Sequence, residues 1–418
     1  MTLKPKNRTK YAHAIMAISI GNALEWYEIV VYGYFAPIIA HLFFPTDDPF
    51  ASLMLAFAAF GITFIMRPLG AVFLGAYADR YGRKVALQIS ILMMMAASAA
   101  IACAPDYGTV GIAAPVVLVA ARMVQGFAVG GEFGSSTAFL AEQDAKRRGF
   151  FASWQFASQG LTAILAAGMG TAITSLLSSA QIDSWGWRLP FLFGLLIGPV
   201  GYYIRRRVPE TEEFRLSRTG RSPLRSIATQ GKQRLLLAIG IVVLGTVAIY
   251  TMVFMPTYVT RQLGLSVSNA FATGMLNGVT QLLLVPVFGA LSDRLGRTTV
   301  PLYAAFIFLL VAYPAFVWLA EEPSVAKLLL FQTLFGVMAS AYIGALPALM
   351  AELFPVCIRT SGLAISYSLG VAIFGGFSPL LHAWLIHTQN FAAPSYLVVA
   401  AAAISLTSLF FIRRIGHR

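Results

Sequence analysis

The sequence predicts an all-α membrane protein in which twelve transmembrane helices form two pseudo-symmetric six-helix bundles. Three observations support this class: an apolar composition, a duplicated loop motif and an uneven distribution of basic residues. Of the 418 residues, 58% are hydrophobic and only 11% are charged, and the mean hydropathy is +0.74. Such a composition excludes a soluble domain and indicates a chain whose main solvent is lipid.

The second observation is a ten-residue repeat. The segment Gly75-Ala-Tyr-Ala-Asp-Arg-Tyr-Gly-Arg-Lys84 returns 214 positions later as Gly289-Ala-Leu-Ser-Asp-Arg-Leu-Gly-Arg-Thr298, with six identical positions. Each copy ends one apolar run and begins the next, so each marks a short polar loop between two membrane helices. Turn and membrane-flank residues would explain one copy, but not the same order twice. The repeat indicates a duplicated chain with two equivalent bundles, the arrangement a secondary transporter needs.

Apolar runs of about 20 residues, the length that crosses a bilayer, define the individual elements. They predict spans at 11–40, 51–76, 85–104, 115–140, 150–175, 188–204, 234–259, 268–291, 299–319, 325–350, 360–385 and 394–412. We expect an N-terminal bundle at 1–204, a cytoplasmic linker at 205–233, rich in charge and turn residues, and a C-terminal bundle at 234–418. The first span is too long and too polar for a cleaved signal peptide.

The third observation, the distribution of basic residues, predicts the orientation. With the N-terminus inside, 25 of the 30 Lys and Arg residues fall in cytoplasmic segments, so both termini are predicted to be cytoplasmic. The basic loops account for the net charge of +13 without a nucleic-acid partner. The partner expected from this composition is the lipid bilayer, and we expect a monomer.

Motifs for enzymatic alternatives are absent from the sequence. It contains no Gly-x-x-x-x-Gly-Lys-Ser/Thr phosphate loop, no His-Glu-x-x-His zinc motif and no Gly-x-Ser-x-Gly nucleophile turn. The two cysteines, Cys103 and Cys357, are predicted near opposite faces of the bilayer and cannot pair. We therefore expect no enzyme, no cofactor and no metal site, and an ion gradient as the source of energy.

Five charged residues lie inside predicted spans, where a charge at mid-depth costs at least ~2.5–3.5 kcal/mol and needs a cavity or a partner. They are Glu25, Glu28, Arg67, Arg122 and Glu132. By helix rise, Glu25, Glu28 and Arg122 share one depth, near the bilayer centre. Arg67 and Glu132 share another depth, nearer the cytoplasm. Static ion pairs remain the structural alternative, and they suit the second grouping better than the first.

Helical spacing places these residues on two stripes. The stripe on the first span comprises Asn22, Glu25, Glu28 and Tyr32, and that on the fourth span comprises Arg122, Gln125, Val129 and Glu132. Two carboxylates one turn apart in a low dielectric, such as Glu25 and Glu28, cannot both stay ionised. One of them is therefore a candidate proton carrier.

Other intramembrane polar residues are weaker signals, equally consistent with interhelical hydrogen bonds and with ligand contacts. They are Gln155, Gln159, Tyr250, Asn277, Gln281, Tyr342 and Tyr367. The histidines, His382 among them, fall near span ends or in the tail, which favours the membrane interface over a proton relay. Gly126, Gly130 and Gly134 form a small-residue ridge on the fourth span, which predicts close helix packing.

These motifs together resemble a known family. The doubled Gly-x-x-x-Asp-Arg-x-Gly-Arg loop and Arg122-x-x-Gln125-Gly126 look like the major facilitator superfamily. Six further motifs resemble those of its metabolite:proton symporter branch. They are Gly21-Asn-Ala-Leu-Glu-Trp-Tyr-Glu28, Met66-Arg-Pro-Leu-Gly70, Gly130-Gly-Glu132, Trp185-Gly-Trp-Arg-Leu-Pro190, Glu210-Thr-Glu-Glu-Phe214 and Glu352-Leu-Phe-Pro355. Within that branch, Ala51-Ser-Leu-Met54, Gly149-Phe-Phe-Ala-Ser-Trp-Gln155 and Ala372-Ile-Phe-Gly-Gly-Phe-Ser-Pro379 look most like bacterial citrate and tricarballylate symporters.

The resemblance covers nearly the whole chain and implies a major facilitator fold in the bacterial inner membrane. It implies proton-coupled import of a small organic anion, a di- or tricarboxylate such as citrate, by alternating access. The alternatives are 2-oxoglutarate, a shikimate-like aromatic acid, a betaine or proline osmolyte, and a transporter-like nutrient receptor. Glu28 and Trp26 depart from the pattern, which more often has Asp and, in citrate carriers, Gln. The chain ends at Arg418 without the long coiled coil of osmolyte carriers, so an osmolyte is the weaker expectation.

The expected roles follow from the stripes and from the resemblance. Arg122 would attract a substrate carboxylate, and the expected substrate-binding set is Asn22, Tyr32, Arg122, Gln125, Gln155, Gln159, Arg188 and Tyr367. Proton coupling is expected at Glu25, Glu28 or Glu132. The two Asp-Arg loops would latch the inner gate by pairing to neighbouring helix ends, which gives a gating set of Arg67, Asp79, Arg83, Asp293 and Arg297.

Overall fold

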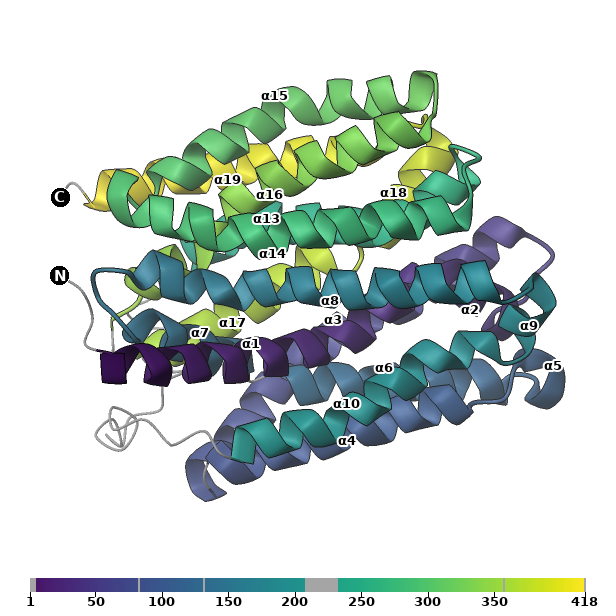
Figure 1. The fold of residues 1–418 in the computed structure, drawn as a ribbon, viewed down its shortest axis with the longest axis horizontal. Helices are drawn as coiled ribbons and strands as arrows, with labels where there is room; N and C mark the ends of the chain where they lie inside the picture. The colour runs from purple at the N-terminus through teal and green to yellow at the C-terminus, as the bar shows by residue number, and fades with distance from the viewer. Residues whose placement is uncertain (1–4, 82, 131, 207–231, 356–357, 417–418) are drawn as a thin grey trace.

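The computed structural model is helical along nearly all of its described length, and the long helices run side by side (Figure 1). It describes residues 5–81, 83–130, 132–206, 232–355 and 358–416; within these ranges, the side chains of 5–14, 78–81, 83–84, 200–206 and a few single positions lie outside the description. Helix α1 begins and α19 ends at the same end of the molecule (Figure 1). We call that end the inner end and the opposite one the outer end.

The N-terminal half supplies the first six predicted spans. They are α1 (Pro5–Tyr34) continued by α2 (Ala36–Phe43), α3 (Pro49–Tyr81), α4 (Arg83–Cys103), α6 (Ala113–Val129) continued by α7 (Glu132–Glu142), α8 (Arg148–Leu176) and α10 (Leu189–Arg206). Short connections at the outer end are α5 (Tyr107–Val110), α9 (Ser179–Ser184) and the 3₁₀ helix η1 (Gly186–Arg188). Most of the predicted linker, 207–231, lies outside the described residues, so the domain boundaries stay a prediction.

The C-terminal half supplies the other six spans. They are α13 (Lys232–Arg261), α14 (Val267–Leu295), α15 (Thr299–Glu321), α16 (Val325–Leu353), the composite span α17 (Arg359–Gly370), η3 (Val371–Gly375) and α18 (Ser378–Thr388), and α19 (Pro394–Gly416). The segment η3 is a single π-helical turn, which interrupts the span near its middle. Such turns insert one residue into the helical ladder and redirect the side chains that follow.

The sequence accounts for where these helices begin and for their length. Asp106, Ser178, Ser266 and Ser324 each accept a hydrogen bond from a backbone N–H in the first turn of the helix that follows, which satisfies an otherwise free donor. Among the described residues, nine helical stretches are long and apolar enough to cross a membrane, and Gln88–Cys103 is a shorter apolar helix. Every predicted span thus coincides with one helix or with a consecutive set of helices in the described part of the chain.

Large apolar side chains cover the outside of the molecule, and charges lie within it. Phe73, Leu92 and Leu310 are 62%, 60% and 59% exposed, whereas Arg67 and Arg122 are 1% and 0% exposed. This inverts the pattern of a soluble protein and is the arrangement expected in lipid. The intramembrane charges therefore point towards the centre of the bundle, where the two halves meet.

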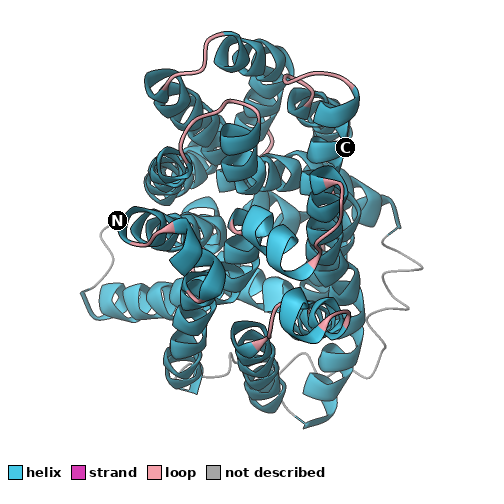
Figure 2. Cartoon of the chain, turned by 90° about the vertical axis from the view of Figure 1, so that its right-hand side faces the viewer, coloured by secondary structure: helices cyan, strands magenta, loops and turns pink. Residues whose placement is uncertain are grey.

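The two halves meet most closely along α8 and α14, which lie side by side (Figure 1; Figure 2 views the helices end on). Two glycine pairs allow this approach: a Cβ atom on Gly149 would collide with the carbonyl oxygen of Gly289, and one on Gly278 would lie 2.8 Å from that of Gly160. We call this line of contact the glycine seam. The small-residue ridge predicted on the fourth span also packs closely against the backbone of α3. A Cβ atom on Gly126 or Gly130 would collide with a carbonyl oxygen of that helix.

Candidate functional site

Arg122 lies on α6 at the centre of the molecule. Its Nη1 donates a hydrogen bond to Gln125 Oε1 at 2.7 Å, and its Cζ lies 4.2 Å from the centre of the Tyr32 ring. The Nε and Nη2 atoms have no hydrogen-bond partner within the described residues. Buried donors are normally bonded, and a guanidinium group matches the planar oxygens of a carboxylate. These two nitrogens are therefore available to an anionic ligand.

Gln125 connects Arg122 to the carboxyl group of Glu28 on α1. Its Nε2 donates to Glu28 Oε2 at 3.4 Å and to Ser98 Oγ at 3.2 Å, while its Oε1 accepts from Arg122. Glu28 is 3% exposed, and its Oε1 has no partner among the described residues. The buried cation and the buried carboxyl group thus meet through one amide. A change of charge at Glu28 reaches Arg122 through that amide.

Glu25 and Glu132 lie at the edge of this centre. Glu25 is half-buried, one turn before Glu28, and close enough to Tyr367 on α17 to interact with it electrostatically. Glu132 begins α7 and is also half-buried. Among the three carboxyl groups named from the sequence, Glu28 is the one that is removed from solvent.

Arg67 on α3 is a second fully buried arginine. Its Cζ lies 4.7 Å from the ring centre of Trp26 and 5.7 Å from those of Phe64 and Tyr367. Its Nε and Nη1 atoms have no hydrogen-bond partner within the described residues. The sequence predicts an ion pair of Arg67 with Glu132 from matching depth, and this pairing stays a prediction; the contacts described here for Arg67 are aromatic. Cation–π contacts stabilise a buried cation but leave its N–H groups unbonded.

Tyr250 on α13 faces both arginines from the C-terminal half. Its ring packs edge-on against Phe60 at 5.7 Å and Phe64 at 5.2 Å, and its hydroxyl group has no partner among the described residues. It lies close enough to Arg67 and Arg122 to interact electrostatically with each. The π-helical turn packs on the other side of this ring, because Gly375 lies against Tyr250. The irregular span therefore borders the central site.

The amides predicted on the first and fifth spans do meet. Asn22 Nδ2 donates to the backbone oxygen of Gln155 at 2.9 Å and to Ser158 Oγ at 2.7 Å, and Gln155 Nε2 donates back to Asn22 Oδ1 at 3.0 Å. These bonds leave Gln155 Oε1 unpartnered, and Gln159 Nε2 is likewise unpartnered among the described residues. The cluster lies between α1 and α8. It offers one free acceptor and one free donor to a ligand.

Three other residues named from the sequence have mainly packing contacts. Tyr32 donates to the backbone oxygen of Ala56 at 3.1 Å, while its ring covers Arg122. Tyr367 stacks on Phe133 of α7 at 3.5 Å. Arg188 lies at the outer end, where it donates to backbone oxygens of Ser184 at 2.6 Å and Ala104 at 3.1 Å. Arg188 is therefore outside the central site.

The second copy of the duplicated loop joins the two halves at the inner end. Asp293 Oδ1 accepts from the N–H of Gly149 at 2.8 Å, and Oδ2 accepts from that of Phe150 at 3.0 Å, so the carboxylate caps the first turn of α8. Arg297 Nη1 contacts Asp293 at 2.5 Å, and Arg297 Nε pairs with Glu352 at 3.0 Å. A carboxylate at a helix N-terminus also meets the positive end of the helix dipole.

Two further ion pairs cross between the halves at the inner end. Arg359 of α17 pairs with Glu142 of α7 at 2.9 Å, and Arg148 of α8 pairs with Glu352 of α16 at 3.4 Å. In the first copy of the loop, the side chains of Asp79 and Arg83 lie outside the described residues. The gating roles of both loops stay predictions, with a geometry for the second.

The sequence signals some residues of the central site only weakly. Tyr250 is one of several intramembrane polar residues, and Trp26 stands out only as a departure from the family pattern. Phe60 and Phe64 carry no signal beyond hydrophobicity. The expectation for His382 is wrong: it is fully buried, and its Nε2 lies 2.9 Å from Thr251 Oγ1. Its span runs on to Thr388, so the histidine lies well inside the helix.

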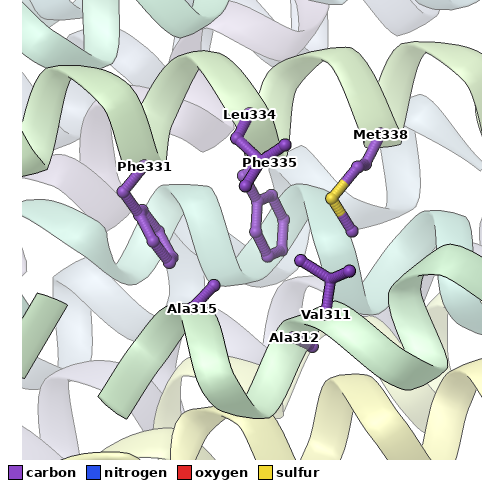
Figure 3. Close-up of a pocket in the computed structure, with 7 residues that line it drawn as sticks. All are labelled: Val311, Ala312, Ala315, Phe331, Leu334, Phe335 and Met338. Atoms are coloured by element: carbon purple, nitrogen blue, oxygen red, sulfur yellow. The ribbon is translucent and has the colours of Figure 1, made fainter. Parts of the chain in front are cut away.

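A different kind of cavity lies in the C-terminal half. Figure 3 shows an apolar pocket between α15 and α16, lined by Val311, Ala312, Ala315, Phe331, Leu334, Phe335 and Met338. None of these side chains carries nitrogen or oxygen, and Leu334 is 45% exposed on the lipid-facing surface. This pocket cannot hold a carboxylate. The polar centre between the halves is the site where a charged solute would bind.

A polar site enclosed by two similar helical bundles, inside an apolar surface, defines a secondary transporter. A family profile described as the Major Facilitator Superfamily matches residues 18–321. The chain belongs to this superfamily, and it is a multi-pass membrane transporter rather than an enzyme.

Two curated relatives match nearly the whole chain. The chain is 37% identical to the citrate-proton symporter of Klebsiella pneumoniae over 406 residues, which cover 96% of this chain and 91% of that one. It is 33% identical to the proline/betaine transporter of Escherichia coli strain K12, over 98% of this chain and 85% of that one. These matches confirm the predicted branch of the superfamily, and they name two different substrate classes.

Solved structures share the fold. A partially occluded, inward-open structure of the xylose transporter from E. coli superposes with a TM-score of 0.74, at 15% sequence identity, over 97% of this chain and 99% of that one. At this identity the likeness extends to the fold alone. It confirms the predicted arrangement of twelve helices in two bundles.

Proposed function

We propose that this protein is a proton symporter of the bacterial inner membrane, with both termini cytoplasmic, that imports an organic anion by alternating access. The substrate we propose is a di- or tricarboxylate such as citrate. The observation that carries this proposal is a pair of donors on Arg122 that have no partner within the described residues. Arg122 is a buried cation linked through Gln125 to the buried carboxyl group of Glu28. The relative named a citrate-proton symporter supports the same class of substrate.

The link through Gln125 suggests how the proton and the anion move together. With Glu28 protonated, the charge of Arg122 is free for a substrate carboxylate. When Glu28 loses its proton, a negative charge appears on the far side of the same amide and competes with the bound anion. Two charges so placed interact strongly in a low dielectric. Release of the proton to the inside would therefore promote release of the substrate, and the loaded carrier would hold both.

The inner end would supply the gate in this cycle. We propose that Asp293 and Arg297 act as a latch, because Asp293 bonds the first turn of α8 across the two halves. The contact between Asp293 and the first turn of α8 must break when the carrier opens inward. Re-forming it would close the inner end before the site is reloaded from outside.

Transport assays on proteoliposomes test the coupling. We expect an imposed inward proton gradient to drive accumulation of labelled citrate or tricarballylate, and a protonophore to abolish accumulation while equilibration continues. The panel should include 2-oxoglutarate, shikimate, proline and glycine betaine, because the E. coli relative is a proline/betaine transporter. Uptake that depends on sodium and ignores pH would contradict proton coupling. Accumulation of betaine but not of citrate would make the zwitterion the substrate.

Arg122→Gln tests the anion site. The variant removes the charge but keeps hydrogen-bonding capacity, and a charge-assisted hydrogen bond contributes about 1.5–3 kcal/mol, so citrate affinity should fall roughly tenfold to a hundredfold. Calorimetric titration in detergent measures the change. Arg414→Gln, at the end of α19, removes an arginine outside the site and is the matched control. Unchanged citrate affinity in a well-folded Arg122→Gln protein would make Arg122 a structural residue.

A further inference from the structure

The proposed mechanism leaves the second buried arginine without a task. Arg67 is 1% exposed, two of its nitrogens have no hydrogen-bond partner among the described residues, and its neighbours are the rings of Trp26, Phe64 and Tyr367. Cation–π contacts stabilise a buried guanidinium group, but each unbonded N–H still costs free energy. An anionic group that enters the site would satisfy those donors.

Arg67 and Arg122 belong to one continuous wall. Phe60 and Phe64 lie one turn apart on α3 with ring centres 5.2 Å apart, and each ring centre is 5.7 Å from the Cζ of one arginine: Phe60 from Arg122, and Phe64 from Arg67. Arg67 lies seven residues after Phe60 on α3, so its backbone is about 10 Å of helix rise nearer the inner end. Two long arginine side chains can approach each other over such a distance. A compact molecule with two charged ends would fit between them.

Tyr250 completes the arrangement from the opposite half. Its ring rests on both phenylalanines, its hydroxyl group is unpartnered among the described residues, and it interacts electrostatically with both arginines. Counted over the described part of the chain, the wall therefore presents four guanidinium nitrogens and one hydroxyl group without a hydrogen-bond partner, in an apolar setting. This is an excess of donors over acceptors, and it suits a ligand with several acceptor groups and more than one negative charge.

We propose that Arg67 and Tyr250 form a second carboxylate subsite, which makes the transporter selective for solutes with at least two carboxylates. The inference rests on the proposed function, in which Arg122 binds the first carboxylate. A monocarboxylate or a zwitterion would reach Arg122 but leave the donors of Arg67 unbonded, and a site with unpaired buried donors rejects such ligands. Tyr250 belongs to the other half, so the second carboxylate would also bridge the two bundles.

A cycle of ligand and protein changes tests this subsite. Glutarate and pentanoate share a five-carbon chain and differ by one carboxylate. We expect wild-type protein to bind glutarate more tightly than pentanoate. Arg67→Gln should lower glutarate affinity about tenfold to a hundredfold, the range of a charge-assisted contact. The same variant should change pentanoate affinity by no more than about twofold from the wild-type value. Pentanoate has no second carboxylate, so the interaction that the variant removes is already missing.

Three controls keep the result interpretable. Arg414→Gln should alter neither affinity, and Arg122→Gln should lower both. Tyr250→Phe removes only the hydroxyl group and should reduce glutarate affinity several-fold without changing that of pentanoate, as loss of one hydrogen bond predicts. Tyr250→Phe also decides the question if Arg67→Gln fails to elute as a single species in gel filtration.

The outcomes separate the two proposals. If wild-type protein binds no carboxylate, the proposed function fails and the subsite fails with it. If wild-type protein binds glutarate and citrate but Arg67→Gln and Tyr250→Phe lower both glutarate and pentanoate affinities equally, or lower neither, the subsite is overturned while the proposed function stands. Selective loss of glutarate binding in either variant supports the subsite.

Discussion

The two ends of the interface between the bundles are closed by different kinds of contact. At the inner end, a carboxylate caps a helix of the opposite half and Arg359 pairs with Glu142. At the outer end, aromatic rings meet: Phe271 of α14 lies 5.6 Å from Phe35 and 5.9 Å from Tyr34. Phe57 and Phe254 meet at 5.7 Å in the same way. Two polar contacts also lie there, Ser175 Oγ with Ser268 Oγ at 3.2 Å and Arg261 Nη1 with the backbone oxygen of Pro49 at 3.5 Å. The inner end is thus held mainly by ion pairs and capping, and the outer end mainly by apolar area.

This difference shows that the two ends can be controlled separately. Charged hydrogen bonds have strict geometry, so they are broken as a unit and respond to neutralisation and to salt. Aromatic contacts lack strict direction, tolerate small shifts and are insensitive to ionic strength. We therefore expect single substitutions to bias the carrier towards opening at one end without weakening the other.

The largest effect is expected at the inner end. Asp293→Ala removes both caps on α8 and one partner of Arg297. A single charge-assisted bond contributes about 1.5–3 kcal/mol, so we expect a shift of at least tenfold to a hundredfold towards inward-open states. A cysteine at Ala364, which faces α7 beside Gly134, reports the shift by its alkylation rate after Cys103 and Cys357 are replaced by Ser. Transport should slow far more than citrate binding weakens.

Glu322→Gln is the matched control for this experiment. It neutralises a carboxylate at the outer end, where Glu322 is 89% exposed, so alkylation at position 364 should not change. If Asp293→Ala left both alkylation and transport at wild-type levels, the second loop would be a membrane flank and no latch.

A smaller shift in the opposite direction is expected at the outer end. Phe271→Leu keeps an apolar side chain but loses the ring contacts with Tyr34 and Phe35. An aromatic pair contributes about 0.5–1.5 kcal/mol beyond its buried area, so outward-open states should gain about two- to tenfold. A cysteine at Thr257, one turn beyond Val253 on the face of α13 that meets α1, should react faster. Faster alkylation at position 364 instead would mean that Phe271 does not belong to the outer closure.

The smallest expected effect is that of salt on the wild-type protein. Raising ionic strength from about 0.1 to 1 M shortens the Debye length from about 10 to 3 Å and weakens half-exposed pairs such as Arg148 with Glu352. Alkylation at position 364 should rise about twofold, because such pairs contribute little individually. Alkylation at position 257 should not rise in the same samples. Equal changes at both positions would show that the ends do not differ in their electrostatics.

The sequence predicts the helices well because the bilayer imposes length and hydropathy on every span. It does not predict their interruptions. The first span breaks at Phe35, between α1 and α2, and the eleventh contains the π-helical turn 371–375, because local backbone geometry there depends on tertiary packing. The burial of His382 is not predicted either, because it depends on the contact with Thr251 of another helix.

The sequence likewise predicts some contacts of the central site and not others. Helical spacing brings Arg122 and Gln125 together, since both lie on one face of one helix. Matching depth brings Glu28 to them, but depth alone says nothing about the direction of a side chain around its helix axis. Arg67 faces Phe64, three residues before it on the same helix, and also Trp26 of α1 and Tyr367 of α17. The contacts with the other two helices leave no periodic signal.

The glycine seam between α8 and α14 has a mechanical consequence. Gly160 and Gly278 lie near the middle of their helices, and backbone meets backbone there, with only the small side chain of Ala163 beside the contact at Gly278. Such a contact serves as a fulcrum, because the bundles can tip about it while few packed side chains must leave their places. The two ends lie on opposite arms of this lever. In the proposed cycle, separation at one arm would be the same movement as approach at the other, so we expect the backbone contact itself to couple the two openings.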